Sequence, residues 1–308
     1  MTALGGPEVL ELQEVERPEP IPTEVLIRVT AAGINPVDWK TRQRGGYQEA
    51  TGGPPLILGW DIAGVVEEID PDVTRFAPGD RVFGMPWFPR VAGGYAEYAT
   101  SPARQLAQTP DSLTDEQAGG LPLAGLTAWQ ALVDVAEVGE GTRVLIHAAA
   151  GGVGHLAVQI AKARGAYVVG TARGEKHDFL RELGVDEPID YTATPFEEAV
   201  SDIDVVFDLI AGEEYGLRSL ETLREGGLWL CIPADVPDAV AAAAREQSKR
   251  AISFLVEPDY AGLEHLAALA DEGRLTVLVE ETYPLAQAAE AHRRLEEGRA
   301  RGKIVLIP

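Results

Sequence analysis

The chain has 308 residues, of which 45% are hydrophobic and 24% charged, so it is long enough for about two domains and too apolar to be disordered. Its formal charge is −23, from 26 basic and 49 acidic residues, which argues against a nucleic-acid or membrane-surface partner. The one cysteine, Cys231, excludes an internal disulfide and any multi-cysteine zinc site. The first residues carry no signal-peptide pattern, and we expect a cytoplasmic protein.

Short β patterns separated by turn residues fill the first hundred residues. Residues 25–29 and 62–66 have the composition of strands. Pro71, Pro78-Gly79 and Gly93-Gly94 supply turn signals. This pattern predicts an irregular, mostly β domain with a barrel-like core.

From about Asp111 the pattern changes to alternating helices and strands. Thr114 and Gln117 have the spacing of a capping box, and a helical stretch follows Pro122. Apolar runs that indicate strands occur at 144–146, 167–169, 205–207 and 228–230, with a final one at 304–307. Alternation of this kind predicts an α/β fold with a doubly wound parallel sheet and helices on both faces.

A glycine-rich turn joins the strand at 144–146 to the next helix. Its sequence, AAAGGVG at 148–154, fits the dinucleotide fingerprint with Ala149 at the first glycine position. The backbone of such a turn can approach a pyrophosphate, and the helix N-terminus supplies N–H donors. We therefore predict that Ala150, Gly151, Gly152, Val153 and Gly154 bind a dinucleotide. A ligand-free turn and the S-adenosylmethionine turn of a methyltransferase are the alternatives.

The end of the second strand indicates which dinucleotide is bound. An NAD site usually has an acidic residue there, which binds the ribose 2′-hydroxyl. This chain instead has Thr171, then Arg173 and Lys176, in an otherwise acidic protein. A cationic pair at this point suits a 2′-phosphate and predicts NADPH, although two solvated surface charges are the alternative.

A second basic run lies at 292–303. We expect Arg293 and Arg294 to be helix-surface residues with pairs such as Arg293–Glu297. Arg301 and Lys303 directly precede an apolar strand, and we expect them to reach the cofactor.

Several longer segments are spread over most of the chain. They are GINPVDWK at 33–40, LGWDIAGVV at 58–66, PGDRVFG at 78–84, GGYAEYA at 93–99, LPLAGLTAWQAL at 121–132, VEPD at 256–259 and RGKIVL at 301–306. Together they resemble the zinc-independent, quinone oxidoreductase branch of the medium-chain dehydrogenases/reductases. The resemblance implies a GroES-like catalytic domain at 1–117, an NADP-binding Rossmann domain at 118–253, and a return to the catalytic domain at 254–308.

The same resemblance argues against a metal site. Zinc-dependent relatives have Cys where this chain has Asn35, His where it has Trp60, and a four-cysteine lobe that this chain lacks. We therefore expect no metal, and hydride transfer from NADPH to an electron-poor acceptor such as a quinone or an α,β-unsaturated carbonyl.

The resemblance also implies roles for single residues. Asn35 corresponds to a residue near the nicotinamide, supported by Asp38, and Tyr47 corresponds to a loop tyrosine that can donate a hydrogen bond. We assign these three as catalytic. The further residues implied for cofactor binding are Thr127, Tyr191, Ile210, Ile232 and Pro233, and Asn35 is shared with this set.

Other activities remain open at this point. An enoyl-thioester reductase and a zinc-free enzyme of the alcohol dehydrogenase type are close alternatives, and a non-catalytic NADPH-binding protein is a distant one. We expect a homodimer, because the apolar strand at 228–232 should lie near a sheet edge unless another segment, such as 254–256, covers it. The strand with which relatives begin is expected to be missing or short here.

Overall fold

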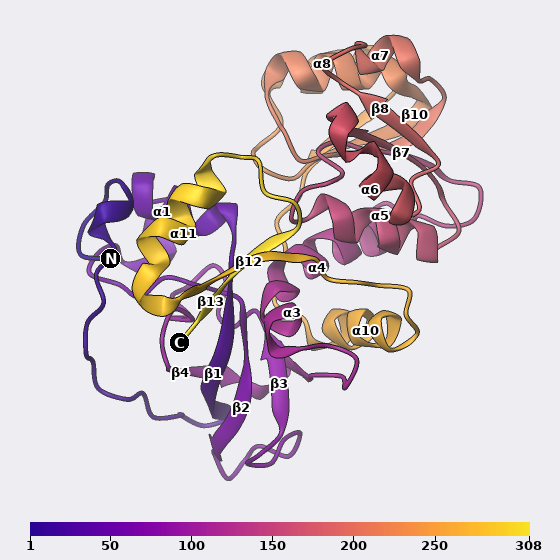
Figure 1. Cartoon of the computed structure of the whole chain (residues 1–308). Coiled ribbons are helices and arrows are strands. Elements are labelled where there is room, and N and C mark those ends of the chain that lie inside the picture. Colours follow the sequence, from indigo (N-terminus) through magenta and orange to yellow (C-terminus); the bar gives the residue numbers. More distant parts are fainter. The chain divides into compact units, whose positions relative to one another are not determined.

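The computed structural model describes residues 1–308, apart from the side chain of Gln48. The chain divides into two compact units, shown in Figure 1. The first unit comprises Met1–Leu126, Glu257–Gly273 and Val277–Pro308, and the second comprises Thr127–Val256 and Arg274–Thr276. The first boundary thus lies nine residues after the expected one and the second lies three residues after it, and the short segment 274–276 joins the second unit in addition.

The first unit is built on a seven-stranded sheet. The strand order is β12-β13-β1-β2-β3-β5, and β4 pairs with β1. These strands are β1 (Glu24–Ile34), β2 (Ile62–Ile69), β3 (Arg81–Gly84), β4 (Tyr98–Pro102), β5 (Leu106–Gln108), β12 (Val279–Pro284) and β13 (Lys303–Ile307). The helices are α1 (Pro36–Arg44), α2 (Gln48–Thr51), α3 (Asp115–Gly120), α10 (Tyr260–Asp271) and α11 (Ala288–Glu296). Helix α4 (Pro122–Trp129) begins in this unit and ends in the second.

Alternating β1 side chains form the core of this unit. Val25, Ile27 and Val29 are almost fully buried and pack in one cluster with β2 and β13 residues. No strand precedes β1 in the described part of the chain, where residues 7–9 form a single 3₁₀ turn. This agrees with the expectation of a missing or short first strand. Leu12 and Val15, in the stretch before β1, are exposed.

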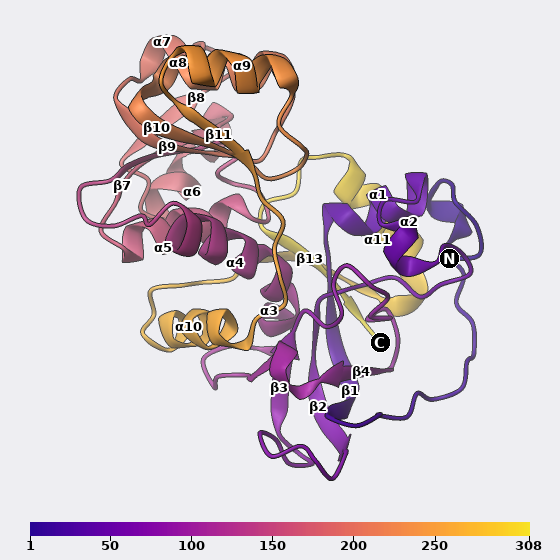
Figure 2. The ribbon, with the colours of Figure 1, turned by 180° about the vertical axis from the view of Figure 1, so that it is seen from behind.

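The second unit contains a six-stranded parallel sheet. Its strand order is β11-β10-β9-β6-β7-β8, the doubly wound arrangement that the sequence predicted. The strands are β6 (Arg143–Ile146), β7 (Tyr167–Ala172), β8 (Glu187–Asp190), β9 (Ile203–Asp208), β10 (Leu223–Cys231) and β11 (Arg250–Ser253). Its helices are α5 (Gly154–Ala163), α6 (His177–Glu182), α7 (Phe196–Ala199), α8 (Glu213–Thr222) and α9 (Asp238–Glu246), and a π-helical turn at Gln130–Val135 continues α4. Figure 2 shows the sheet between α5 on one face and α8 and α9 on the other.

The edge of this sheet differs from the expectation. Strand β10 pairs in parallel with β9 on one side and with β11 on the other, so it is an interior strand. The covering strand is Arg250–Ser253, and Phe254–Val256, which was considered as an alternative cover, lies outside any strand. The dimer prediction assumed that β10 is an exposed edge strand. This assumption was wrong, because the open edge of the sheet belongs to β11.

Local signals in the sequence were confirmed elsewhere. Thr114 and Gln117 form a reciprocal capping box at α3, with Gln117 N–H donating to the Thr114 hydroxyl. No helix among the described residues is long and apolar enough to cross a membrane.

Candidate active site

The glycine-rich turn leads from β6 into α5 in the second unit. The N–H of Gly151 donates to the carbonyl of Ala148, which closes the turn. The N–H groups of Gly152, Val153 and Gly154 have no acceptor among the described residues. They lie at the N-terminus of a ten-residue helix, where the helix dipole favours an anion.

Gly154 fixes the shape of this turn. A Cβ atom at this position would lie 2.3 Å from the Ala148 carbonyl oxygen and 2.8 Å from the Ala149 Cα atom. Both are backbone atoms, so no side-chain rotation could relieve the clash. Glycine is therefore required for α5 to start this close to the turn.

The carboxyl ends of β7 and β8 bring three predicted residues together. Ala172 pairs with Asp190, so the residues that follow them, Arg173 and Tyr191, lie at the same end of adjacent strands. Arg173 is exposed, and Lys176 follows in the next turn. The Asp190 carboxylate accepts hydrogen bonds from Thr192, which lower its pKa. The arrangement gathers two cations and a phenol at the edge where a ribose phosphate would bind.

Thr171, at the end of β7, has a buried side chain. Its hydroxyl lies 3.2 Å from His147 Nδ1. The other His147 nitrogen lies 3.1 Å from the Ser219 hydroxyl, and burial lowers the pKa of His147 to about 3. The Thr171 hydroxyl therefore faces the interior of the second unit, and the contact of Thr171 with the cofactor stays a prediction. Thr127 is also buried, on α4, and its assigned contact stays a prediction.

The remaining predicted cofactor residues follow β9 and β10. Ile210 is 48% exposed, and its N–H donates to the buried carboxylate of Asp208. Asp208 also accepts hydrogen bonds from the Ala211 N–H and the Trp229 indole, so it shapes the loop after β9. Ile232 and Pro233 are half-buried directly after β10. All of these loops lie at the carboxyl edge of the sheet, where doubly wound folds bind ligands.

The first unit contains a buried polar cluster around Asn35. The antiparallel register of β1 and β13 pairs Ile34 with Ile304, so Lys303 lies opposite Asn35. Lys303 Nζ donates to Asn35 Oδ1, and Asn35 Nδ2 donates to Asp61 Oδ2 at 2.7 Å. The second oxygen of Asp61 accepts the N–H of Leu123 at 2.7 Å. All three side chains are at most 3% exposed.

The charges in this cluster are one cation and two carboxyl groups. Lys303 Nζ lies 3.6 Å from Asp61 Oδ2, whereas Asp38 has no ion-pair partner among the described residues. The Asp38 Oδ2 atom accepts the Asn35 N–H at 2.6 Å, and no described residue forms a hydrogen bond with its buried Oδ1 atom. Burial raises the pKa of Asp38 to about 7, with the Asn35 N–H opposing the change. Asp38 thus supports the Asn35 backbone, as predicted, and retains a proton close to neutral pH.

Three buried residues extend the cluster toward the surface. The Arg42 guanidinium, which can only donate, lies 3.1 Å from His292 Nδ1 and donates to Glu296 at 2.8 Å. His292 Nδ1 must therefore accept, which leaves the proton on Nε2, 3.2 Å from the Tyr95 hydroxyl. Burial lowers the pKa of His292 to about 3, consistent with a neutral ring. The Tyr95 phenol is close enough to Asp38 for the two groups to shift each other's pKa.

The aromatic residues of this unit pack around Trp60. The Trp60 indole is buried and donates to the Arg90 carbonyl at 2.6 Å, and its ring packs edge-on against Phe88. The Tyr47 ring also packs edge-on against Phe88, with the two ring centres 5.4 Å apart. Tyr47 is half-buried at the turn between α1 and α2, and its catalytic role stays a prediction.

The comparisons with known proteins agree with this geometry. Residues 21–111 match the model of the alcohol dehydrogenase GroES-like domain, and residues 183–306 match a model described as a zinc-binding dehydrogenase. The 2-haloacrylate reductase of a Burkholderia species is 35% identical over 99% of this chain and 96% of its own. The chain belongs to the medium-chain dehydrogenase/reductase family. This confirms the resemblance and the fold class expected from the sequence.

Solved structures extend the comparison. The quinone oxidoreductase of Coxiella burnetii is 37% identical, with a TM-score of 0.93 over 100% of this chain and 97% of its own. The Escherichia coli quinone oxidoreductase complexed with NADPH is 28% identical, with a TM-score of 0.89 over 100% and 98%. A polyketide synthase of Streptomyces halstedii, GfsB, is 41% identical over 82% of this chain, but the chain spans only 5% of that protein.

The described residues of this medium-chain dehydrogenase/reductase do not form the ligand group that the zinc-binding description implies. No group of three or more His, Cys, Asp or Glu side chains within residues 1–47 and 49–308 could hold a metal ion. Zinc-dependent relatives have ligands at the positions of Trp60 and Asn35. Here the Trp60 indole donates to the Arg90 carbonyl, and Asn35 accepts a hydrogen bond from Lys303. The Lys303 ammonium instead provides a cation beside Asn35 and Asp61.

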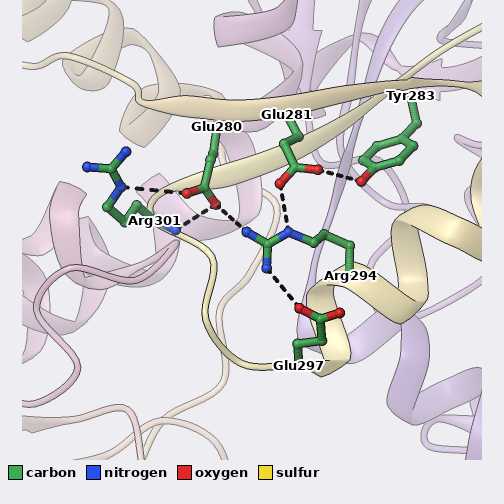
Figure 3. Close-up of polar contacts among 6 residues, drawn as sticks. All are labelled: Glu280, Glu281, Tyr283, Arg294, Glu297 and Arg301. Atoms are coloured by element: carbon green, nitrogen blue, oxygen red, sulfur yellow. Dashed lines mark hydrogen bonds and ion pairs between the residues drawn. The ribbon is translucent and has the colours of Figure 1, made fainter. Parts of the chain in front are cut away.

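The basic run at 292–303 forms an ion-pair network, shown in Figure 3. Arg294 donates to Glu281 at 2.6 Å, to Glu280 at 3.2 Å and to Glu297 at 3.3 Å. Both the backbone N–H and the side chain of Arg301 contact Glu280, at 2.9 and 3.6 Å. Arg293 pairs with Glu290, so the expected Arg293–Glu297 pair was wrong.

The ion-pair network holds the turn that precedes β13. In this turn Gly302 has a φ of +68° and packs against the backbone of Leu278. The residue that follows is Lys303. Arg301 therefore helps to position Lys303 from the surface, and its contact with the cofactor stays a prediction.

Sequence reasoning missed four polar residues of the first unit: Arg42, Asp61, Tyr95 and His292. Asp61 could have been found, because it directly follows Trp60 in the segment that resembles the family. Arg42 and His292 are 250 residues apart, and no local pattern connects them.

Proposed function

We propose that this chain is an NADPH-dependent reductase that transfers hydride to a quinone or an α,β-unsaturated carbonyl without a metal ion. The observation that carries the proposal is the buried Lys303–Asn35–Asp61 cluster, which supplies a fixed ammonium in a family whose zinc-dependent members use a metal. Quinones and enones need only modest stabilisation of a developing oxygen anion, which hydrogen bonds can provide.

The residues of the second unit fit an NADPH molecule. The three N–H groups at the start of α5 would bind the pyrophosphate, and the carboxyl ends of β7 and β8 would hold the 2′-phosphate. When bound, the cofactor supplies the hydride. The chain contributes binding and orientation, because no group of described side chains could hold a metal ion and the one thiol, Cys231, is buried.

The experiment that tests this function follows NADPH absorbance with a panel of quinones and enones. We expect turnover with at least one acceptor, and we expect the rate to survive exhaustive treatment with a chelator. Elemental analysis should find no stoichiometric metal. A tightly held zinc whose removal abolishes turnover would contradict the proposal.

A second candidate function is reduction of an enoyl thioester. It is favoured by three polyketide synthases among the relatives, and by the structure of CurK enoyl reductase, with a TM-score of 0.90 and 27% identity. A crotonyl-pantetheine thioester in the same panel distinguishes the two. A kcat/KM for the thioester well above that for every quinone and simple enone would favour this candidate.

Cofactor preference depends on the cationic edge of the second unit. We expect Lys176→Ala to weaken NADPH binding several-fold or more, because a charge-assisted phosphate contact contributes on the order of 1.5–3 kcal/mol. NADH, which lacks the 2′-phosphate, should bind almost unchanged. Dissociation constants from cofactor fluorescence measure both. Equal losses for NADPH and NADH would show that Lys176 acts on the fold or on a phosphate that both cofactors share.

The oligomeric state also belongs to this proposal. Strand β11 is the open edge of the second sheet, and its Ile252 and the nearby Leu255 are 37% and 51% exposed. An exposed strand edge with apolar side chains favours pairing with a second copy around a two-fold axis. We propose a homodimer on this basis, and sedimentation at micromolar concentration should give twice the mass of one chain. The cytoplasmic location stays a prediction.

A further inference from the structure

The Asn35 carboxamide lies between two opposite charges. Its Oδ1 atom accepts a hydrogen bond from the Lys303 ammonium, and its Nδ2 atom donates to the Asp61 carboxylate at 2.7 Å. The three side chains come from three places in the first unit: the N-terminus of α1, the start of β13 and the residue before β2. Each is at most 3% exposed, so water screens these charges weakly.

This arrangement permits one orientation of the amide. Rotating the carboxamide by half a turn would place the NH₂ group against the ammonium and the carbonyl oxygen against the carboxylate. Both new contacts would be repulsive, and each would remove the hydrogen bond that the amide makes to a buried charged group. The orientation of Asn35 is therefore set by charge, unlike that of most asparagine side chains.

The fixed orientation leaves one hydrogen-bond donor free. Nδ2 carries two hydrogens, of which Asp61 accepts one, and no described residue accepts the other. The Asp61 carboxylate is itself held by the Leu123 N–H, so the assembly cannot easily rotate as a unit. A donor that is fixed in advance, shielded from water and next to an ammonium is suited to an oxygen that gains negative charge.

We propose that Lys303 and Asp61 are positioning residues that lock the Asn35 carboxamide, so that its free N–H donates to the carbonyl oxygen of the acceptor. The proposal rests on the proposed function, since a carbonyl is the group that quinones and enones share. Its chemistry is one hydrogen bond: Nδ2–H donates and the substrate oxygen accepts, with no covalent step at Asn35. Lys303 thereby acts through Asn35, and its role differs from the direct cofactor contact that the sequence suggested.

The test is a double-mutant cycle with Lys303→Met and Asn35→Ala. Methionine keeps the length of the lysine side chain and removes the charge. We expect each single variant to lower kcat for a quinone about tenfold or more, with a smaller change in the NADPH dissociation constant. The double variant should be no slower than Asn35→Ala, because Lys303 acts through the amide. Lys303→Arg, which keeps a cation, should restore part of the rate.

A matched control and an independent measurement complete the design. Arg293→Met makes the same kind of change at an exposed cation paired with Glu290, and it should leave kcat unchanged. The side-chain amide signals of Asn35 can be assigned by NMR through their loss in Asn35→Ala. We expect these signals to shift in Lys303→Met and in Asp61→Asn, and to stay in place in Arg293→Met.

Two results would overturn the proposal that Lys303 positions Asn35. One is a double variant whose loss of kcat is the product of the two single losses, and the other is a Lys303→Met enzyme with unchanged kcat. If Lys303→Met does not fold, Asp61→Asn carries the same test, because an amide at position 61 accepts either orientation of Asn35. A wild-type protein that oxidises NADPH with none of the quinones or enones of the panel would refute the proposed function, whereas the NMR signals would still decide whether Lys303 holds the amide.

Discussion

Replacing Gly154 with alanine is expected to abolish NADPH binding and to destabilise the second unit. The new Cβ would lie 2.3 Å from the Ala148 carbonyl oxygen, well inside van der Waals contact, and both atoms are attached to the backbone. The turn can relieve this clash only by opening, which costs about 1–3 kcal/mol in overpacked sites. Opening also moves the N–H groups of Gly152 and Val153 away from the position of a pyrophosphate. Cofactor titration and thermal unfolding measure the two effects.

Gly139→Ala is the matched control for this change. It lies shortly before β6 in the same unit, and the nearest atom to its added Cβ is 4.0 Å away. We expect nearly unchanged NADPH affinity and stability. A folded Gly154→Ala protein that binds NADPH as tightly as Gly139→Ala would mean that the pyrophosphate lies elsewhere.

The second unit was predictable from the sequence because its signals are local. A strand, a glycine turn and an amphipathic helix follow one another within 25 residues, and each strand end places its loop at the same sheet edge. The identity of the edge strand was not predictable. Arg250–Ser253 is only four residues long and mostly exposed, so it has no hydrophobic run to mark it as the strand that covers β10.

The polar cluster of the first unit was only partly predictable. Asn35 and Asp38 could be assigned because they lie in one segment that resembles the family. Their partners depend on strand register: Lys303 meets Asn35 because β1 and β13 pair across 268 positions of sequence. Arg301 and Lys303 look equivalent as a basic pair, yet one is exposed beside Glu280 and the other is buried. Burial of a lysine follows from tertiary packing, which the sequence pattern does not contain.

Replacing Asp38 with asparagine is expected to stabilise the protein above neutral pH. Burial raises the pKa of Asp38 in the folded state to about 7, from an ordinary value of 3.8. Between these values the unfolded chain releases the proton and the folded chain keeps it, so stability falls as pH rises through this window. Each pH unit contributes about 1.4 kcal/mol, or on the order of 4 kcal/mol across the window. An asparagine cannot ionise, and its carbonyl oxygen can still accept the Asn35 N–H.

The measurement is the difference in unfolding free energy between the variant and the wild type from pH 4 to pH 8. Differences are needed because His147 and His292 act in the opposite direction. The pKa of each is lowered to about 3 in the folded state, so their contribution is present above pH 6.5 and is lost as pH falls below it. Both histidines are unchanged in Asp38→Asn, so their contribution cancels.

We expect the advantage of Asp38→Asn to grow from near zero at pH 4 to its full value at pH 8, whereas Asp72→Asn, at an exposed loop position, should show none. An Asp38→Asn protein that is less stable than wild type at pH 8 would mean that Asp38 is ionised and well solvated in the folded state, and that the Asn35 cluster carries a net negative charge.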